Sequence, residues 1–353
     1  MKLSDIVDRI NGNVDRFTTD LEYYIGGEHI DSNELEITRG GNLKENLGKL
    51  GFKFHFAFQD RDVIFMARNP HLRKAGMVMF SGLCSDASYI LRSKDENVIT
   101  QEFLAVQLQS DHFWDYCERT KVGSVNFANN WTSIANYEFD LPSIDKQKEI
   151  AKKVWAAYNL KKSYRKLLSA TQEMVKSQFI EMFKGDNQVP LGDICNIEKG
   201  ATITRNDVLS GEVPVVAGGQ EPSCYHNVAN REAGAITVSA SGAYAGFINF
   251  WNCPIFASDC NTVISKDDKK TDQTFIYFGL KAMQKQIYGL QKGGAQPHVY
   301  GKDLQKFMFP YPSYAKQIMF SNIARQADKS EFELRKSIEA IDQVIKSLIN
   351  DIK

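Results

Sequence analysis

Apolar side chains recur at helical spacing along a segment in the middle of the chain. Between residues 143 and 183 there is no Gly and no Pro, and residues of high helix propensity dominate. The segment predicts one helix of about 40 residues, about 60 Å long at 1.5 Å per residue. Lys161 and Gln178 interrupt its 4,3 spacing of apolar or small residues, and such a stripe needs a partner helix. The stripe consists of Ile150, Val154, Ala157, Tyr164, Leu168, Thr171, Val175 and Met182.

A second segment of the same kind occupies the end of the chain. From residue 313 to residue 353 there is again no Gly and no Pro. Its apolar seam is heptad-like and slips once near Leu334, as a stutter would. We expect the two helices to pair as an antiparallel coiled coil. The second seam consists of Phe320, Ile323, Ala327, Leu334, Ile338, Ile341, Ile345, Leu348 and Ile352.

Short motifs repeat between the two halves of the chain. Residues 142–147 and 312–317 both read Pro-Ser-x-x-Lys-Gln, 170 positions apart, and each opens a predicted helix. Residues 3–6 and 191–194 both read Leu-x-Asp-Ile. The chain therefore looks like a duplicated unit and not a solenoid of many repeats.

Alternating apolar and polar positions predict strands in both halves, at 52–58, 63–67, 235–240 and 247–251. Shorter helical stretches follow near 101–116 and 274–288. The predicted fold class is α+β, with two α/β domains alternating with the two long helices. The predicted boundaries are 1–142 for the first domain, 143–187 for the first helix, 188–311 for the second domain and 312–353 for the second helix.

Composition restricts the function less than the pattern does. The chain has 353 residues with 43 basic and 43 acidic side chains, so net charge alone gives no reason to expect nucleic acid. The six cysteines form no CxxC pair, which disfavours a zinc or redox site. No apolar run is long enough to cross a bilayer, and the N-terminus lacks the apolar stretch of a signal peptide. We expect a soluble, cytoplasmic protein with no membrane partner.

Motifs for autonomous catalysis are lacking. The nearest approach to the Asn-Pro-Pro-Tyr motif of base methyltransferases is Asn-Pro-His-Leu at residues 69–72, and there is no Gly-Lys-Ser or Gly-Lys-Thr of a Walker A segment. The acidic pairs 60/62 and 267/268 occupy turn-like sequence and do not suggest a nuclease metal site. No catalytic residue, metal or cofactor is therefore expected.

Basic and amide side chains cluster near a strand end in the first half. The arginines and lysine there suit phosphate contact, and the asparagines suit bidentate contact with adenine in a major groove. An ordinary charged loop and simple Asn-rich turns remain the alternatives. The candidate DNA-binding residues are Arg61, Arg68, His71, Arg73 and Lys74, together with Asn126, Asn129 and Asn130.

The second half carries two glycine-rich segments in corresponding positions. Residues 239–246 follow a strand, and their small side chains would let the backbone approach a polyanion closely. Residues 291–300 precede the second long helix. They occupy the same position in the second half that the Asn-rich loop occupies in the first half. The candidates here are Ser239, Ser241, Tyr244, Lys292, Gln296 and His298.

At these residues the sequence resembles the DNA specificity subunits of type I restriction-modification systems. The resemblance covers essentially the whole chain as two target-recognition domains, each followed by a long helix. The helix openings depart from the family, which usually has Glu-Gln where this chain has Lys146-Gln147 and Lys316-Gln317. The segments that carry the resemblance are 24–30, 62–65 with Arg68 and Lys74, 82–85, 239–247, 293–297 and 310–312.

The resemblance implies a subunit that reads double-stranded DNA while two methyltransferase subunits and the restriction subunits supply catalysis. Each domain would read one half-site of a bipartite target, and helix length would set the unread spacer. Apolar residues on the outer helix faces could dock the methyltransferase subunits, although packing against the recognition domains is the alternative. These residues are Trp155, Tyr158, Leu160, Leu167 and Phe179.

Two other classes of protein share some of these features. A coiled-coil scaffold that tethers two protein-binding domains would have the same helices but no DNA affinity at low salt. A degenerate DNA methyltransferase would need a binding site for the methyl donor. Binding to DNA and binding to a labelled methyl donor distinguish the three readings.

Overall fold

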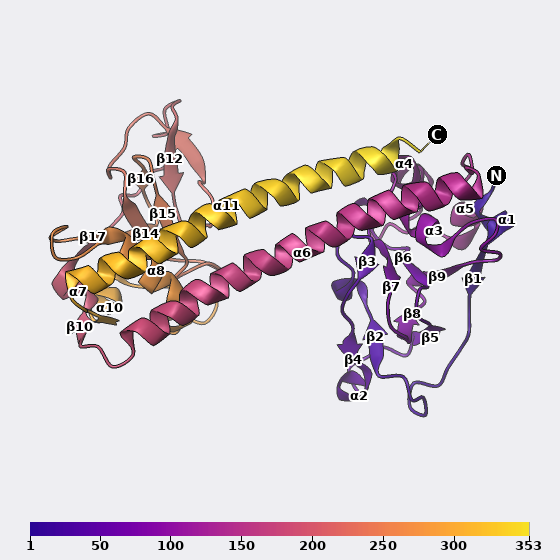
Figure 1. Cartoon of the computed structure of the whole chain (residues 1–353), viewed down its shortest axis with the longest axis horizontal. Helices are drawn as coiled ribbons and strands as arrows, with labels where there is room; N and C mark the ends of the chain where they lie inside the picture. The colour runs from indigo at the N-terminus through magenta and orange to yellow at the C-terminus, as the bar shows by residue number, and fades with distance from the viewer. Residues whose placement is uncertain (353) are drawn as a thin grey trace. The chain divides into compact units, whose positions relative to one another are not determined.

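The computed structural model describes residues 1–352, which form two compact units (Figure 1). Unit 1 contains residues 1–164 and the C-terminal segment that starts at Lys336. Unit 2 contains residues 165–335. Each unit combines one α+β domain with parts of both long helices, so the predicted α+β class and the internal duplication are confirmed.

The domain of unit 1 contains two sheets. The central strand of the larger sheet, β6 (Val63–Met66), is apolar throughout because both its faces are covered: Val63 and Phe65 enter one core and Ile64 enters another. The order of this sheet is β1 (Val7–Ile10), β9 (Ser88–Ser93), β6, β7 (Ala75–Val78) and β3 (Glu36–Ile37). The order of the smaller sheet is β4 (Gly41–Asn42), β2 (Tyr23–Ile25), β8 (Gly82–Ser85) and β5 (Phe54–Phe58).

Short helices complete this domain. The predicted helical stretch 101–116 is two helices, because Ser110 accepts a hydrogen bond from the amide of Phe113 and starts a new helix there. The helices are α1 (Leu3–Ile6), α2 (Leu43–Asn46), α3 (Gln101–Gln107), α4 (Asp111–Thr120) and α5 (Trp131–Ala135), with 3-10 turns η1 (Gly27–His29) and η2 (Pro70–Leu72).

The domain of unit 2 repeats the main part of this arrangement. Its four-stranded sheet has the order β11 (Cys195–Lys199), β17 (Cys260–Ser265), β14 (Ala235–Ser239) and β15 (Ile248–Trp251). The smaller sheets are β13 (Cys224–His226), β12 (Val213–Val216) and β16 (Phe256–Ala257), and β10 (Gln188–Pro190) with β18 (Met308–Pro310). The helices are α7 (Leu191–Ile194), α8 (Gln273–Ala282), α9 (Gln284–Tyr288) and α10 (Gly301–Gln305). The strand order β1-β9-β6 in the larger sheet of unit 1 therefore corresponds to the order β11-β17-β14 in unit 2.

The long helices are α6 (Ile144–Phe183) and α11 (Tyr314–Asn350), within a few residues of the prediction; Lys353 lies outside the described residues. In unit 1, Val154 and Tyr158 near the start of α6 pack with Ile345 and Ile349 near the end of α11. In unit 2 the opposite ends share a core, in which Phe179 and Phe183 of α6 meet Phe320 and Ala324 of α11. The helices thus run antiparallel. The boundaries predicted at 142, 187 and 311 stay a proposal, since both units include parts of both helices.

No helix in residues 1–352 combines the length and the apolar character that crossing a membrane requires.

Candidate nucleic-acid interface

The Asn-rich segment of unit 1, residues 121–130, forms a tight turn that we name loop 1. Val122 and Ala128 exchange two backbone hydrogen bonds of 2.8 and 2.9 Å and close it. Gly123 has a φ of +107°, and a Cβ there would lie 2.6 Å from the carbonyl oxygen of Asn126. Only glycine fits this position without strain. Asn126 is exposed at the tip of the turn.

Loop 1 is held against the chain that leaves β6. The amide of Asn69 donates to the carbonyl of Phe127 at 2.8 Å, and the amide of Asn129 donates to the carbonyl of Ala67 at 2.9 Å. Arg68 therefore lies beside the turn, in an isolated β-bridge with Ala128. Two clusters that are distant in the sequence thus form one surface.

Unit 2 builds the same arrangement at residues 291–300, which we name loop 2. Lys292 and His298 exchange backbone hydrogen bonds of 2.9 and 2.8 Å, and Gly293 has a φ of +97° with Gln296 at the tip. The chain that leaves β14 holds loop 2, because Gly242 donates to the carbonyl of Pro297 at 3.0 Å. Loops 1 and 2 lie 170 residues apart, as the helix openings do, so the duplication includes the candidate interface.

The basic cluster of unit 1 divides into exposed and engaged members. Arg68 and His71 are exposed, and among the described residues neither side chain makes an ion pair or hydrogen bond. Arg73 pairs with Asp111 at 2.5 Å, and the Lys74 ammonium donates to the carbonyl of Gly27 at 2.6 Å. Only Arg68 and His71 therefore have their full side chain available to a ligand.

Arg61 does not belong to this surface. It lies before β6, whereas Arg68 follows the opposite end of the same strand. Its guanidinium pairs with Glu102 at 2.7 Å and with Glu96 at 3.3 Å. The expectation that Arg61 contributes to one cluster with Arg68 is corrected on these grounds.

Some of the polar candidates serve the loops themselves. Asn129 is buried and its amide nitrogen donates to the carbonyl of Cys117 at 2.8 Å, so it cannot reach a base. Asn130 is exposed, but its side chain caps α5 by accepting from the amide of Ser133 at 2.8 Å. Asn126 remains the amide that loop 1 offers outward. The expected role of Asn129 is therefore corrected to a structural one.

The candidates of unit 2 divide in the same way. Ser239 is buried, which corrects its expected DNA contact, and Ser241 donates its hydroxyl to the carboxylate of Asp259. Tyr244 and Gln296 are exposed. Lys292 is also exposed, although it pairs with Asp303 at 2.7 Å. The exposed groups among these candidates are thus the Gln296 amide and the partly neutralised Lys292 ammonium on loop 2, and the Tyr244 phenol on the segment 239–246.

Loop 2 also carries an aromatic pair of which only one member was expected. The rings of His298 and Tyr300 stack with centroids 5.9 Å apart and planes at 18°, and the Lys302 ammonium lies 5.6 Å from the Tyr300 centroid. Tyr300 is 45% exposed. The sequence signal for Tyr300 was an aromatic residue two positions before a lysine, which is common on protein surfaces.

Two of the five residues expected to dock a partner are core residues. Tyr158 and Phe179 are each 3% exposed, packed in unit 1 and unit 2 respectively, which corrects the expectation for both. Trp155 is half-buried and its indole donates to the carbonyl of Glu102 at 3.2 Å. Leu160 and Leu167 are about half exposed and remain available.

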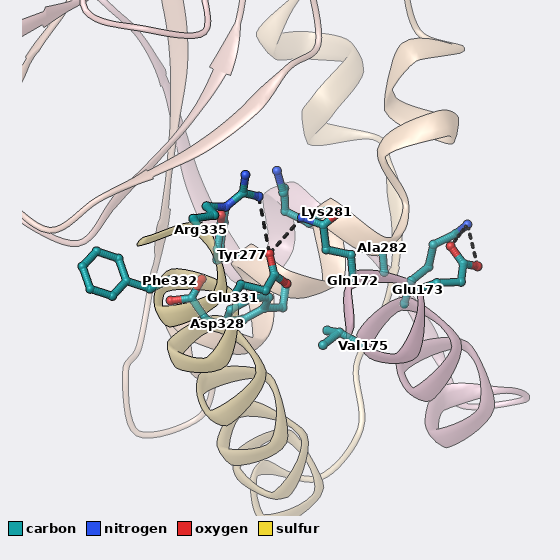
Figure 2. Close-up of a pocket in the computed structure, with 12 residues that line it drawn as sticks. Gln172, Glu173, Val175, Tyr277, Lys281, Ala282, Asp328, Glu331, Phe332 and Arg335 are labelled. Atoms are coloured by element: carbon teal, nitrogen blue, oxygen red, sulfur yellow. Dashed lines mark hydrogen bonds and ion pairs between the residues drawn. The ribbon is translucent and has the colours of Figure 1, made fainter. Parts of the chain in front are cut away.

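Unit 2 has a groove of about 490 Å³ among α6, α8 and α11. Figure 2 shows Gln172 and Arg335 both reaching the carboxylate of Glu331, at 2.9 and 3.7 Å. Burial lowers the pKa of Lys281 and raises the pKa of Tyr277 to about 12. Acidic and basic side chains line the groove in equal number, which does not favour binding of a polyanion there.

No group of three His, Cys, Asp or Glu side chains in residues 1–352 could hold a metal ion.

The molecule is thus a duplicated α+β protein with one loop surface on each unit and two long antiparallel helices. The family model of the type I restriction modification DNA specificity domain matches residues 1–168 and again residues 185–342. The chain belongs to this family of specificity subunits. No protein of curated function matches the sequence.

Solved structures share the fold at low sequence identity. The S subunit of a type I restriction-modification system from M. genitalium is 14% identical, with a TM-score of 0.65 over 99% of this chain and 94% of that one. A structure that concerns complex assembly and conformational transition of the type I R-M system is 17% identical, with a TM-score of 0.55 over 99% of this chain and 95% of that one. At these identities both comparisons show that the fold is shared, and they say nothing about individual side chains.

Proposed function

We propose that this chain reads a bipartite double-stranded DNA target, with one half-site for each loop surface, and recruits the subunits that modify and cut it. The observation that carries the proposal is the recurrence of the same glycine-closed turn, held on the same strand end, at loop 1 and loop 2. The repeated turn gives each unit an equivalent exposed loop, which supports one DNA contact for each unit.

The side chains on the two surfaces differ, so the half-sites differ too. In unit 1, Arg68 follows β6 and forms the bridge to loop 1. In unit 2, Ser241 forms the corresponding bridge to loop 2. Asn126 and Gln296 occupy the tips of the two turns, and both amides suit adenine. Arg68 suits a phosphate or a guanine edge. Domains of one scaffold with unlike contacts read an asymmetric target, which a symmetric dimer cannot do.

Catalysis comes from partner subunits in this proposal. Two methyltransferase subunits bind, one for each domain and helix, and the restriction subunits join that complex. Leu160, Leu167 and the half-buried Trp155 are the candidates on α6 for a partner contact, since each keeps apolar surface accessible. The chain itself transfers no methyl group and cuts no DNA.

An electrophoretic mobility shift with the purified chain tests this proposal. The chain is titrated against duplex DNA at low salt, alone and with an adenine methyltransferase subunit from the same restriction system. Binding that tightens with the methyltransferase, together with no binding of a labelled methyl donor by the lone chain, supports the proposal. No DNA binding in either arm indicates a protein scaffold, and donor binding by the lone chain indicates a degenerate methyltransferase.

A further inference from the structure

Gln147, four residues into the first long helix, is a fully buried amide with three hydrogen bonds. Its Nε2 donates to the carbonyls of Val98 at 2.8 Å and Pro142 at 2.9 Å, and its Oε1 accepts from the amide of Thr100 at 3.1 Å. Thr100 is the residue that caps α3. One side chain therefore joins the turn before α6 to the start of a helix in the domain.

Gln317 makes the same three bonds in unit 2. Its Nε2 donates to the carbonyls of Lys270 at 3.2 Å and Pro312 at 3.1 Å, and its Oε1 accepts from the amide of Asp272 at 3.0 Å. Asp272 caps α8, as Thr100 caps α3. The bonding pattern is thus the same in both units, although two of the three contacted residues differ in type.

A second contact follows two turns further along each helix. In unit 1 the indole of Trp155 donates to the carbonyl of Glu102, the second residue of α3. In unit 2 the guanidinium of Arg325, 170 residues after Trp155, donates to the hydroxyl of Thr274, the second residue of α8. Two contacts about 12 Å apart along a helix, at 1.5 Å per residue, define its direction relative to the domain.

We propose that Gln147 and Gln317 are positioning residues, which fix the angle between each recognition domain and its long helix and thereby the length of the DNA spacer. This inference rests on the proposed function, because it assigns the spacer to two particular side chains. A buried amide that satisfies three backbone groups is bonded fully in one orientation only, and other orientations leave buried polar groups without partners. Base pairs are stacked about 3.4 Å apart, so a small change of angle at a domain suffices to select a different spacer.

The spacer distribution tests this role more directly than affinity does. Full-length chain carrying Gln147→Leu or Gln317→Leu, with the methyltransferase subunit present, selects bound sequences from a random duplex pool. We expect the half-site bases to stay the same while discrimination against spacers one base pair longer or shorter falls about tenfold, equivalent to ~1.4 kcal/mol. Gln326→Leu is the matched control, because Gln326 is an exposed amide on α11, and it should keep the narrow distribution.

A second variant covers the case in which the leucine variants do not fold. Arg325→Ala removes the second contact of unit 2, in which an exposed guanidinium donates to the hydroxyl of Thr274, and it should broaden the distribution as well. An unchanged, narrow spacer in the folded variants, with a merely uniform loss of affinity, would overturn the inference and leave the glutamines a stability role. A wild-type chain that selects no two-part site would instead overturn the proposed function.

Discussion

The ammonium of Lys161 on α6 lies 2.6 Å from the carboxylate of Asp342 on α11 and is almost completely buried. The same ammonium lies 3.0 Å from the carboxylate of Glu34 in the domain of unit 1. The residues 170 positions away, Glu331 and Gln172, form the corresponding contact in unit 2 at 2.9 Å. The two helices are thus complementary at equivalent positions in both units, through an ion pair in one and an amide–carboxylate bond in the other.

Removing the Lys161 ammonium should destabilise unit 1 strongly. Lys161→Met removes the ammonium that neutralises the mostly buried carboxylate of Glu34 and the partly exposed carboxylate of Asp342, and we expect a loss of ~3 kcal/mol in the free energy of unfolding. Lys153→Ala is the control, because Lys153 pairs with Glu149 on the exposed face of α6, and its loss should change the free energy of unfolding little. Urea titration followed by circular dichroism measures both. Equal losses would show that the Lys161 contact is not a determinant of helix pairing.

Arg68 should contribute a phosphate contact that Arg73 does not. Arg68→Ala should weaken binding to all duplexes and reduce the slope of log affinity against log salt by about 0.9, because one fewer counterion is released. Arg73→Ala should instead lower stability, since it leaves Asp111 without its 2.5 Å partner. Binding isotherms at several salt concentrations distinguish the two. A salt slope that responds to Arg73 and not to Arg68 would contradict the assignment.

The turn in loop 2 should be sensitive to a single methyl group. Gly293→Ala forces a side chain into φ +97° with its Cβ 2.8 Å from the carbonyl of Gln296, at a cost of ~1–2 kcal/mol. We expect weaker base preference at one half-site and no change at the other. Gly294→Ala is a close control, because nothing lies within 4 Å of a Cβ at that position. Loss of preference at both half-sites, or in the control, would indicate a general effect on folding.

Lengthening both helices should lengthen the spacer. Insertion of one heptad after Leu168 and one after Ile338 keeps each apolar seam in phase. It adds about 10 Å to each helix at 1.5 Å per residue. About three base pairs span that distance, at about 3.4 Å each. Affinity for the original site should fall and selection should recover a longer spacer between unchanged half-sites. Changed half-site bases with the original spacer would mean that the helices do not set the distance.

The helices and the duplication could be predicted from sequence because their signals are local. Forty residues without Gly or Pro have few alternatives to a helix, and the Pro-Ser-x-x-Lys-Gln motif marks the same step in both halves. The sequence also shows that Lys161 interrupts the apolar stripe. It does not show that Lys161 forms ion pairs, because its partners Glu34 and Asp342 lie 127 and 181 positions away in the chain.

The candidate interface could be predicted only as a region. Loops 1 and 2 were found through their amides and glycines, but which side chains remain available depends on distant partners such as Asp111 and Glu102. Tyr158 and Phe179 were misassigned because α6 packs on a domain as well as on α11, so one apolar stripe did not describe its buried surface.

The central proposal is that one chain reads a bipartite target through two unlike loop surfaces, one on each unit. Selection of bound sequences from a random duplex pool, with the wild-type chain and its methyltransferase subunit, tests this claim most directly. The predicted result is two short, different base clusters separated by an unread spacer of a single length. A single uninterrupted motif, a palindrome, or no enrichment would contradict it.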